Sequence, residues 1–326
     1  MTGVVDRSSE VAGPQAQGHG PIEEIRRRVA THLVGRQREL DLLLAAVAAG
    51  RDVVIEGPPG TSKSTLLGAI TQEWGIPLLF VEGNADLTPA RIVGHHNPAQ
   101  VLREDYHEDN FVPGPLIAAM KSGGFLYVEE FNRAPEDTLN TLLTAMAERR
   151  ITIPRVGTVE ALPTFRVVAS MNPYDNVGTT RLSTSVHDRL CRLAIGYQDA
   201  EAERGIVRLR TRLDSERLIS DAVALTRATR VHEAITQGSS VRGAIDTALV
   251  AHQLAALRQV SIPSSSDLTP PRNLPEDYIS VVLEAILVSL SGRVHVDETA
   301  DSTPEQVLRT IWEDHFLLEP AAAAPG

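Results

Sequence analysis

Short apolar runs alternate with amphipathic segments along the first two thirds of the chain. The runs are rich in β-branched and aromatic residues, which is typical of strands buried on both faces of a sheet. The segments between them repeat their apolar residues every three or four positions, which predicts helices that cover such a sheet. The pattern predicts strands at 53–55, 77–81, 125–128, 165–170 and 193–195, and helices at 22–32, 40–47, 64–74, 116–121 and 135–146.

The pattern becomes helical after about residue 198. Helices are expected at 201–213, 221–237, 241–257, 278–290 and 304–318. We therefore expect an α/β core with a parallel sheet over 21–197 and a smaller all-helical domain over 198–320. These are flanked by a disordered arm at 1–20 and a tail at 321–326.

Two segments of the core interrupt the alternation of strands and helices. Residues 82–115 show no period, and a long non-periodic stretch inside a compact domain is usually functional. It contains the pair His95 and His96, for which a metal site and a solvated loop are both open, with the loop favoured because no spaced third ligand follows. Residues 151–162 predict a hairpin around Gly157.

Composition narrows the class of protein. Of the 326 residues, 42% are hydrophobic and 22% are charged, which indicates a globular chain. A formal net charge of −11 argues against a nucleic-acid-binding surface. One cysteine, Cys191, fits a reducing compartment, and we expect it to be a small buried apolar residue. With neither a signal peptide nor a 20-residue apolar run, we expect a soluble, cytoplasmic protein without membrane insertion.

The strand at 53–55 leads into a candidate phosphate-binding loop. Its sequence is Gly57, Pro58, Pro59, Gly60, Thr61, Ser62, Lys63 and Ser64, followed by Thr65. The pattern asks for glycine before the lysine, where this chain has Ser62. Backbone N–H groups at a helix N-terminus attract an anion, the lysine ammonium group adds positive charge, and the hydroxyl of Ser64 can reach Mg²⁺. A Gly/Pro turn before an ordinary helix is the alternative.

Polar residues end two of the predicted strands. Glu129 and Glu130 follow 125–128, and Asn172 follows 165–170. Ligands of open α/β sheets bind at the carboxyl ends of the strands, so these side chains are expected beside the phosphate loop. One carboxylate would hold Mg²⁺, the other would orient or deprotonate the attacking water, and the amide would position that water or contact the γ-phosphate. Solvated acids and a turn-forming asparagine are the alternatives.

These motifs, in this order, resemble AAA+ ATPases, and more closely the MoxR family with its CbbQ, NorQ and GvpN relatives. The segments that carry the resemblance are LVGRQRELDLLLAAVAAGRDVVIEGPPGTSKS, GPL, EEFNRAPEDTLNTLLTAMAER, ASMNP, LSTSVHDRL and GSSVRG, between residues 33 and 243. The resemblance implies ATP and Mg²⁺ as cofactors. It makes Lys63 and Ser64 the Walker A pair, Glu129 the Walker B metal ligand and Glu130 the catalytic base.

Other roles also come from this resemblance. Asn172 matches sensor 1, Arg242 matches sensor 2, and Val34 and Gly35 fall where the family contacts adenine. Arg189 matches the arginine finger, which completes a neighbouring subunit's site, although Arg181 and Arg192 are close by in the sequence. Glu129 departs from the usual aspartate and Ser62 from the usual glycine or alanine.

The family's assembly and partners are implied in the same way. It forms rings, commonly hexamers, and remodels protein clients as a chaperone, often with a partner that carries a von Willebrand factor A domain. Residues 97–113 and the hairpin would be insertions that face the pore. An ATP-gated assembly scaffold with little hydrolysis and a nucleic-acid motor are the alternatives.

Overall fold

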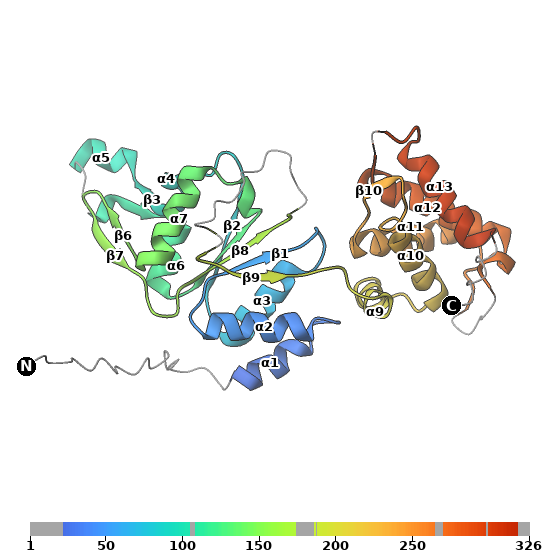
Figure 1. Cartoon of the computed structure of the whole chain (residues 1–326), viewed down its shortest axis with the longest axis horizontal. Helices are drawn as coiled ribbons and strands as arrows, with labels where there is room; N and C mark the ends of the chain where they lie inside the picture. The colour runs from blue at the N-terminus through green and yellow to red at the C-terminus, as the bar shows by residue number, and fades with distance from the viewer. Residues whose placement is uncertain are drawn as a thin grey trace, which may run out of the picture. The chain divides into compact units, whose positions relative to one another are not determined.

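The computed structural model describes residues 22–104, 108–173, 186, 188–264, 270–297 and 299–318. The predicted arm at 1–20, the tail at 321–326 and Arg181 lie outside the described residues. The described chain divides into two compact units (Figure 1). The first contains residues up to Pro58 and Ser62–Gly196, and the second contains Pro59–Thr61 with the residues from Tyr197 onward.

A five-stranded parallel sheet forms the centre of the first unit, as predicted. Its order is β2-β5-β8-β1-β9. The strands are β1 (Val53–Glu56), β2 (Leu78–Glu82), β5 (Phe125–Glu129), β8 (Arg166–Met171) and β9 (Cys191–Ala194). Because β8 pairs with both β1 and β5, the segment that follows β8 begins between the ends of those two strands.

Helices cover both faces of this sheet (Figure 1). On one face, Val53 and Phe125 pack with residues of α1 (Ile22–Ala30), α2 (Gln37–Ala48) and α3 (Lys63–Trp74). On the other face, Val54 and Leu126 pack with residues of α6 (Pro115–Ser122) and α7 (Glu136–Glu148). Successive strand side chains point to opposite faces, so a strand buried on both sides must be a continuous apolar run.

The prediction of an irregular stretch at 82–115 was wrong. It holds α4 (Pro89–Val93), β3 (Gly94–His96), α5 (Pro98–Glu104), the 3₁₀ turn η1 (Glu108–Asn110) and β4 (Phe111–Pro113). β3 and β4 form an antiparallel pair. These elements are each seven residues or shorter, too short to show a period in sequence.

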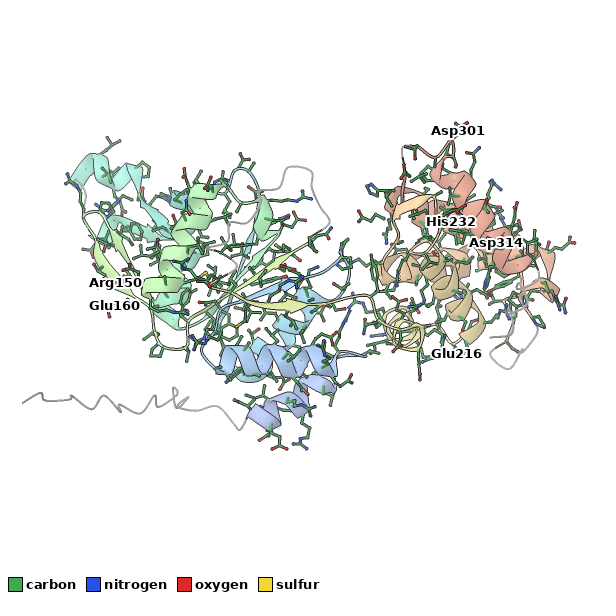
Figure 2. The ribbon with its side chains drawn as sticks, in the orientation of Figure 1. Arg150, Glu160, Glu216, His232, Asp301 and Asp314 are labelled. Atoms are coloured by element: carbon green, nitrogen blue, oxygen red, sulfur yellow. The ribbon has the colours of Figure 1, made fainter. Side chains whose placement is uncertain are left out.

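The predicted hairpin is confirmed as β6 (Arg150–Ile153) and β7 (Gly157–Glu160). Arg150 and Glu160 stand opposite each other at its open end (Figure 2). The 3₁₀ turn η2 (Phe131–Arg133) follows β5. Pro135 is the N-cap of α7 instead of its first helical residue, a shift of one position.

The second unit is helical, as predicted, and has its own core. Its helices are α9 (Ala200–Thr211), α10 (Glu216–Ala228), α11 (Val241–Arg258), α12 (Glu276–Leu290) and α13 (Pro304–Phe316), with short 3₁₀ turns at η3 (Pro271–Asn273) and η4 (Ser291–Arg293). The helix predicted at 221–237 was wrong at its end. It stops at Ala228, and β10 (Ile235–Gln237) pairs with β11 (His295–Val296).

Two further observations bear on the sequence predictions. Cys191 is exposed on β9, so the expectation of a buried residue was wrong. Its strand is at the edge of the sheet, where one face of the strand can remain open to solvent. In the part of the chain that the structure describes, no helix combines the length and apolarity needed to span a bilayer.

Candidate nucleotide-binding site

The predicted phosphate loop connects β1 to α3. Its start is fixed to the sheet because the backbone N–H of Gly57 donates to the carbonyl of Met171, 3.1 Å away at the end of β8. Lys63 is the first residue of α3, and its Nζ donates to the carbonyls of Gly57 (2.8 Å) and Pro58 (2.9 Å). The ammonium group is thus folded back over the loop, at a helix N-terminus that favours an anion.

Ser62, the departure from the loop pattern, has a left-handed backbone. Its φ is 66° and its ψ is 25°, and its side chain makes no capping hydrogen bond. This conformation is the one that glycine adopts without penalty. The loop therefore has the turn that precedes α3 even with serine at this position, but the serine is strained there.

The acidic end of β5 contacts the loop. Glu129 is the last residue of that strand, and the Ser64 hydroxyl donates to its Oε1 at 3.1 Å. The Tyr127 hydroxyl lies 2.8 Å from the Ser170 hydroxyl and 3.5 Å from Glu129 Oε1. Burial raises the pKa of Tyr127, so its hydroxyl remains protonated and can donate a hydrogen bond. The structure thus brings together two residues predicted to bind the metal.

Glu130 follows on a strained backbone. Its φ is 51°, again in the left-handed region, and its Oε2 lies 3.2 Å from Nε of Arg133. A Cβ at Gly83 would lie 2.3 Å from the carbonyl oxygen of Glu130, so the neighbouring chain approaches as closely as glycine permits. Strained backbone of this kind persists where surrounding structure holds it, often at functional sites.

The remaining predicted site residues lie on different elements. Asn172 directly follows β8, which in the sheet order is between the strands that carry Glu129 and the loop. Gly35 has a φ of 65° before α2 and follows Val34. Arg189 is exposed just before β9. Arg242 is in the first turn of α11, in the second unit. Its backbone N–H donates to the side chain of Ser240, the N-cap residue of that helix.

Sequence reasoning missed the ion pair between Glu56 and Arg192. Arg192 Nε lies 2.5 Å from Glu56 Oε2, and the side chain of Glu56 is 5% exposed. These residues are 136 positions apart on the neighbouring strands β1 and β9, and no local pattern links them. The guanidinium group of Arg192 is thus bound within its own chain.

The oxygen donors at this site fit Mg²⁺. A hydroxyl and a carboxylate 3.1 Å apart are hard ligands, and Mg²⁺ commonly binds one or two protein groups together with waters and phosphate oxygens. No group of three or more His, Cys, Asp or Glu side chains within the described ranges is placed to hold a metal.

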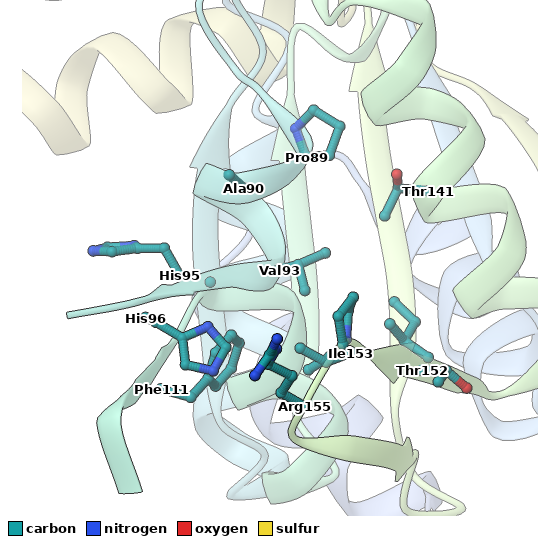
Figure 3. A pocket seen from close by; sticks show the side chains of 13 residues that line it. Pro89, Ala90, Val93, His95, His96, Phe111, Thr141, Thr152, Ile153 and Arg155 are labelled. Carbon is teal, nitrogen blue, oxygen red and sulfur yellow. The ribbon is translucent and has the colours of Figure 1, made fainter. Parts of the chain in front are cut away.

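A hollow of about 470 Å³ lies between the β3/β4 pair and the β6/β7 hairpin of the first unit (Figure 3). His96, Phe111 and Arg155 gather on one of its sides, while His95 points away from them (Figure 3). The His96 and Phe111 rings meet edge to face with centroids 5.4 Å apart. None of the residues predicted to bind the nucleotide lines this hollow.

The α/β core with its parallel sheet and the helical second unit are the fold of AAA+ ATPases, as the sequence predicted. The family model of the AAA domain (dynein-related subfamily) matches residues 52–190. The chain is 28% identical to an uncharacterized protein of Staphylococcus epidermidis over 202 residues (60% of this chain, 76% of that protein). It is 25% identical to gas vesicle ATPase GvpN1 of Halobacterium salinarum over 259 residues (72% and 73%), and GvpN is one of the groups that the sequence resembles.

A solved structure agrees on the fold. A single-substitution variant of RuvB from Thermotoga maritima superposes with a TM-score of 0.50 at 17% identity, over 80% of this chain and 72% of that one. Similarity at this level of identity concerns the fold alone.

Proposed function

We propose that this chain hydrolyses ATP with Mg²⁺ in an oligomeric ring and uses the cycle to remodel a protein partner. Lys63 binds the β- and γ-phosphates, and the loop 57–65 surrounds them with backbone N–H groups. Ser64 and Glu129 hold the metal, which offsets the charge that develops on the transferred phosphoryl group. Glu130 accepts a proton from the attacking water. Asn172 and Arg242 position the water and the γ-phosphate.

The hydrogen bond between Ser64 and Glu129 is the observation that supports this proposal most directly. It joins the loop after β1 to the end of β5, two strands that are not neighbours in the sheet. A hydroxyl and a carboxylate that already lie 3.1 Å apart need little rearrangement to share one Mg²⁺. The longer side chain of Glu129 reaches Ser64 from the strand end, so the replacement of the usual aspartate does not remove this contact.

The choice among the candidate arginine fingers is supported by the ion pair of Arg192. A finger must leave its own chain to reach the phosphates of a neighbouring subunit. Arg192 is paired with the buried Glu56 of its own chain, which counts against Arg192 as the finger. We assign the finger to Arg189 because its segment resembles the one that carries the finger in the family. This assignment requires a ring, and hexamers are the form that we expect.

The client is a protein in this proposal, and the cytoplasm is its setting. A net charge of −11 is unfavourable for a motor that tracks nucleic acid. A partner that carries a von Willebrand factor A domain is part of the proposal by resemblance alone. A second candidate is an ATP-gated assembly scaffold with little hydrolysis, which the departures from the family pattern at Ser62 and Glu129 favour.

The substitution Glu130→Gln tests the proposed chemistry. It removes the base but keeps the size and polarity of the side chain, so we expect kcat to fall by about 10²–10⁴-fold while ATP still binds. Glu82→Gln is the matched control, because Glu82 ends β2 in register with Glu129 and is exposed. Its kcat should match that of the wild type.

Steady-state ATPase assays and titration with ATP separate these outcomes. Turnover that persists in Glu130→Gln would contradict the role of Glu130. Tight ATP binding with near-zero turnover in the wild-type chain, at concentrations where rings form, would favour the scaffold instead.

A further inference from the structure

The turn that precedes α11 is held tightly to the end of α10. Ser239 is buried in that turn, and its N–H donates to the Thr229 hydroxyl at 2.9 Å. Its carbonyl accepts a hydrogen bond from Nε of Arg230 at 2.7 Å. A Cβ at Gly238 would lie 2.6 Å from the carbonyl oxygen of Thr229, so only glycine permits this approach. The backbone N–H and the carbonyl of Ser239 are thus held by two consecutive residues, Thr229 and Arg230.

Arg230 is itself held by a buried carboxylate. Its Nη1 lies 2.7 Å from Oε1 of Glu203, a residue of α9 that is 2% exposed. Arg227 approaches the other oxygen of Glu203 at 3.3 Å. The guanidinium group of Arg230 also lies 4.0 Å from the ring centroid of Tyr197, which favours a cation–π contact. A buried carboxylate is costly unless it is paired, so this arrangement strongly favours one position of Arg230.

This turn sets the start of α11 and therefore the position of Arg242 in the first turn of that helix. Ser240 is the N-cap of α11, and its hydroxyl accepts from the backbone N–H of Arg242 at 3.4 Å. Only Ser240 and Val241 therefore lie between Ser239, whose carbonyl Arg230 holds, and Arg242. A basic residue in the first turn of a helix is unfavourable with respect to the helix dipole, so packing of the turn has to hold it.

We propose that Arg230, anchored by Glu203, is a positioning residue that sets the first turn of α11 and thereby the place of Arg242. The inference rests on the proposed function, in which Arg242 contacts the nucleotide phosphates. Arg230 acts through the carbonyl of Ser239 and makes no contact with the nucleotide. Loss of its side chain should leave α11 formed but Arg242 misplaced.

A second buried arginine in the same unit provides a matched control. Arg217 lies 2.8 Å from Asp221, and the two side chains are 11% and 3% exposed. For Arg230 and Glu203 the corresponding values are 10% and 2%. Asp221 also accepts from the Tyr278 hydroxyl and contacts His315, at 2.8 and 2.9 Å. Neither Arg217 nor Asp221 is part of the turn before α11.

The experiment measures kcat and KM for ATP in Arg230→Met, Arg217→Met, Arg242→Ala and the double variant Arg230→Met with Arg242→Ala. We expect Arg230→Met to lower kcat/KM about tenfold, which is about 1.4 kcal/mol of transition-state stabilisation. Arg217→Met should lower the melting temperature as much as Arg230→Met does, but it should leave kcat/KM within about twofold of the wild type. In the Arg242→Ala background, Arg230→Met should have no further effect, because it acts through Arg242.

The outcomes test separately the proposed role of Arg242 and the proposed positioning role of Arg230. If Arg242→Ala leaves kcat/KM unchanged, the proposed role of Arg242 is wrong. If Arg242→Ala lowers it but Arg230→Met does not, or if the two effects multiply in the double variant, the positioning role of Arg230 is wrong. Should Arg230→Met melt below the assay temperature, Arg230→Lys and Thr229→Val replace it, since each removes a single contact with the turn.

Discussion

Replacement of Ser62 by glycine should stabilise the protein. Ser62 has a φ of 66° and a ψ of 25°, and its side chain makes no capping hydrogen bond that the change would remove. An L-residue in the left-handed region costs about 1–2 kcal/mol, and glycine relieves this cost. Glycine also has more conformational entropy in the unfolded chain, which lowers the free energy of unfolding by about 0.4–1 kcal/mol and offsets part of the gain. We therefore expect a net gain of about 0.5–1 kcal/mol.

The expected gain corresponds to a small but measurable shift in melting temperature. For a unit of this size, 1 kcal/mol shifts the melting temperature by about 2–4 °C, so Ser62→Gly should raise it by about 1–4 °C. The kinetics should change little, because the backbone already has the turn that glycine would adopt. We expect kcat and KM for ATP to stay within about twofold of the wild type.

Gln259→Gly serves as the matched control. Gln259 is exposed, has a φ of 55° and ends α11 with backbone hydrogen bonds only. It should give a similar gain in stability through the same relief of strain. Calorimetry or denaturant unfolding of the three proteins, with ATPase assays beside them, tests the reasoning. An unchanged or lower stability in Ser62→Gly beside a gain in Gln259→Gly would refute it, and a large rise in kcat would show that Ser62 limits turnover.

Three further predictions concern charged side chains. Arg189→Ala should lower kcat by about 10³-fold or more, because it removes the finger that we propose acts in trans. Arg192→Ala should keep its ATPase activity per folded molecule, but its free energy of unfolding should fall by about 1–2 kcal/mol because the buried Glu56 is left unpaired. A loss of kcat in Arg192→Ala beside an unchanged kcat in Arg189→Ala would make Arg192 the finger instead. Asp52 is buried and accepts from the N–H of Val167 at 2.7 Å and from Arg149 at 2.6 Å. Burial raises the pKa of Asp52, so a neutral side chain is tolerated there. Asp52→Asn should cost about 1 kcal/mol or less, and Asp52→Ala about 2–3 kcal/mol because Val167 loses its acceptor; equal costs in urea unfolding would contradict this.

The sheet and the loop could be predicted because each depends on a local pattern. A buried parallel strand is a run such as residues 125–128, and the phosphate loop is a fixed spacing of residue types. Once the strands are parallel, their carboxyl ends share one edge of the sheet, so Ser64 and Glu129 could be expected near each other without any structure.

The missed features depend on contacts between distant parts of the chain. β10 and β11 are three and two residues long and are separated by more than fifty positions, so neither has a signal of its own. The network of Glu203, Arg230 and Ser239 joins a helix to two turns, and any charged helix contains similar residues. Tyr127 reads as a buried strand residue, although its hydroxyl reaches Ser170 on the neighbouring strand.

Three strands of the sheet end in glutamate, and the structure gives each one a different environment. Glu56 ends β1, is buried and is paired with Arg192 from the edge strand. Glu82 ends β2 at the other edge of the sheet and is exposed. Glu129 ends β5 between them and accepts from Ser64.

Residue type and position in the strand are the same in all three, so the order of strands decides which carboxylate can reach the loop. The order places β5 two strands from β1, with β8 between them, and the Ser64 hydroxyl still reaches Glu129 across the end of β8. Glu129 is therefore our proposed metal ligand because of its strand's place in the sheet, while Glu56, nearest to the loop in sequence, is already paired with Arg192.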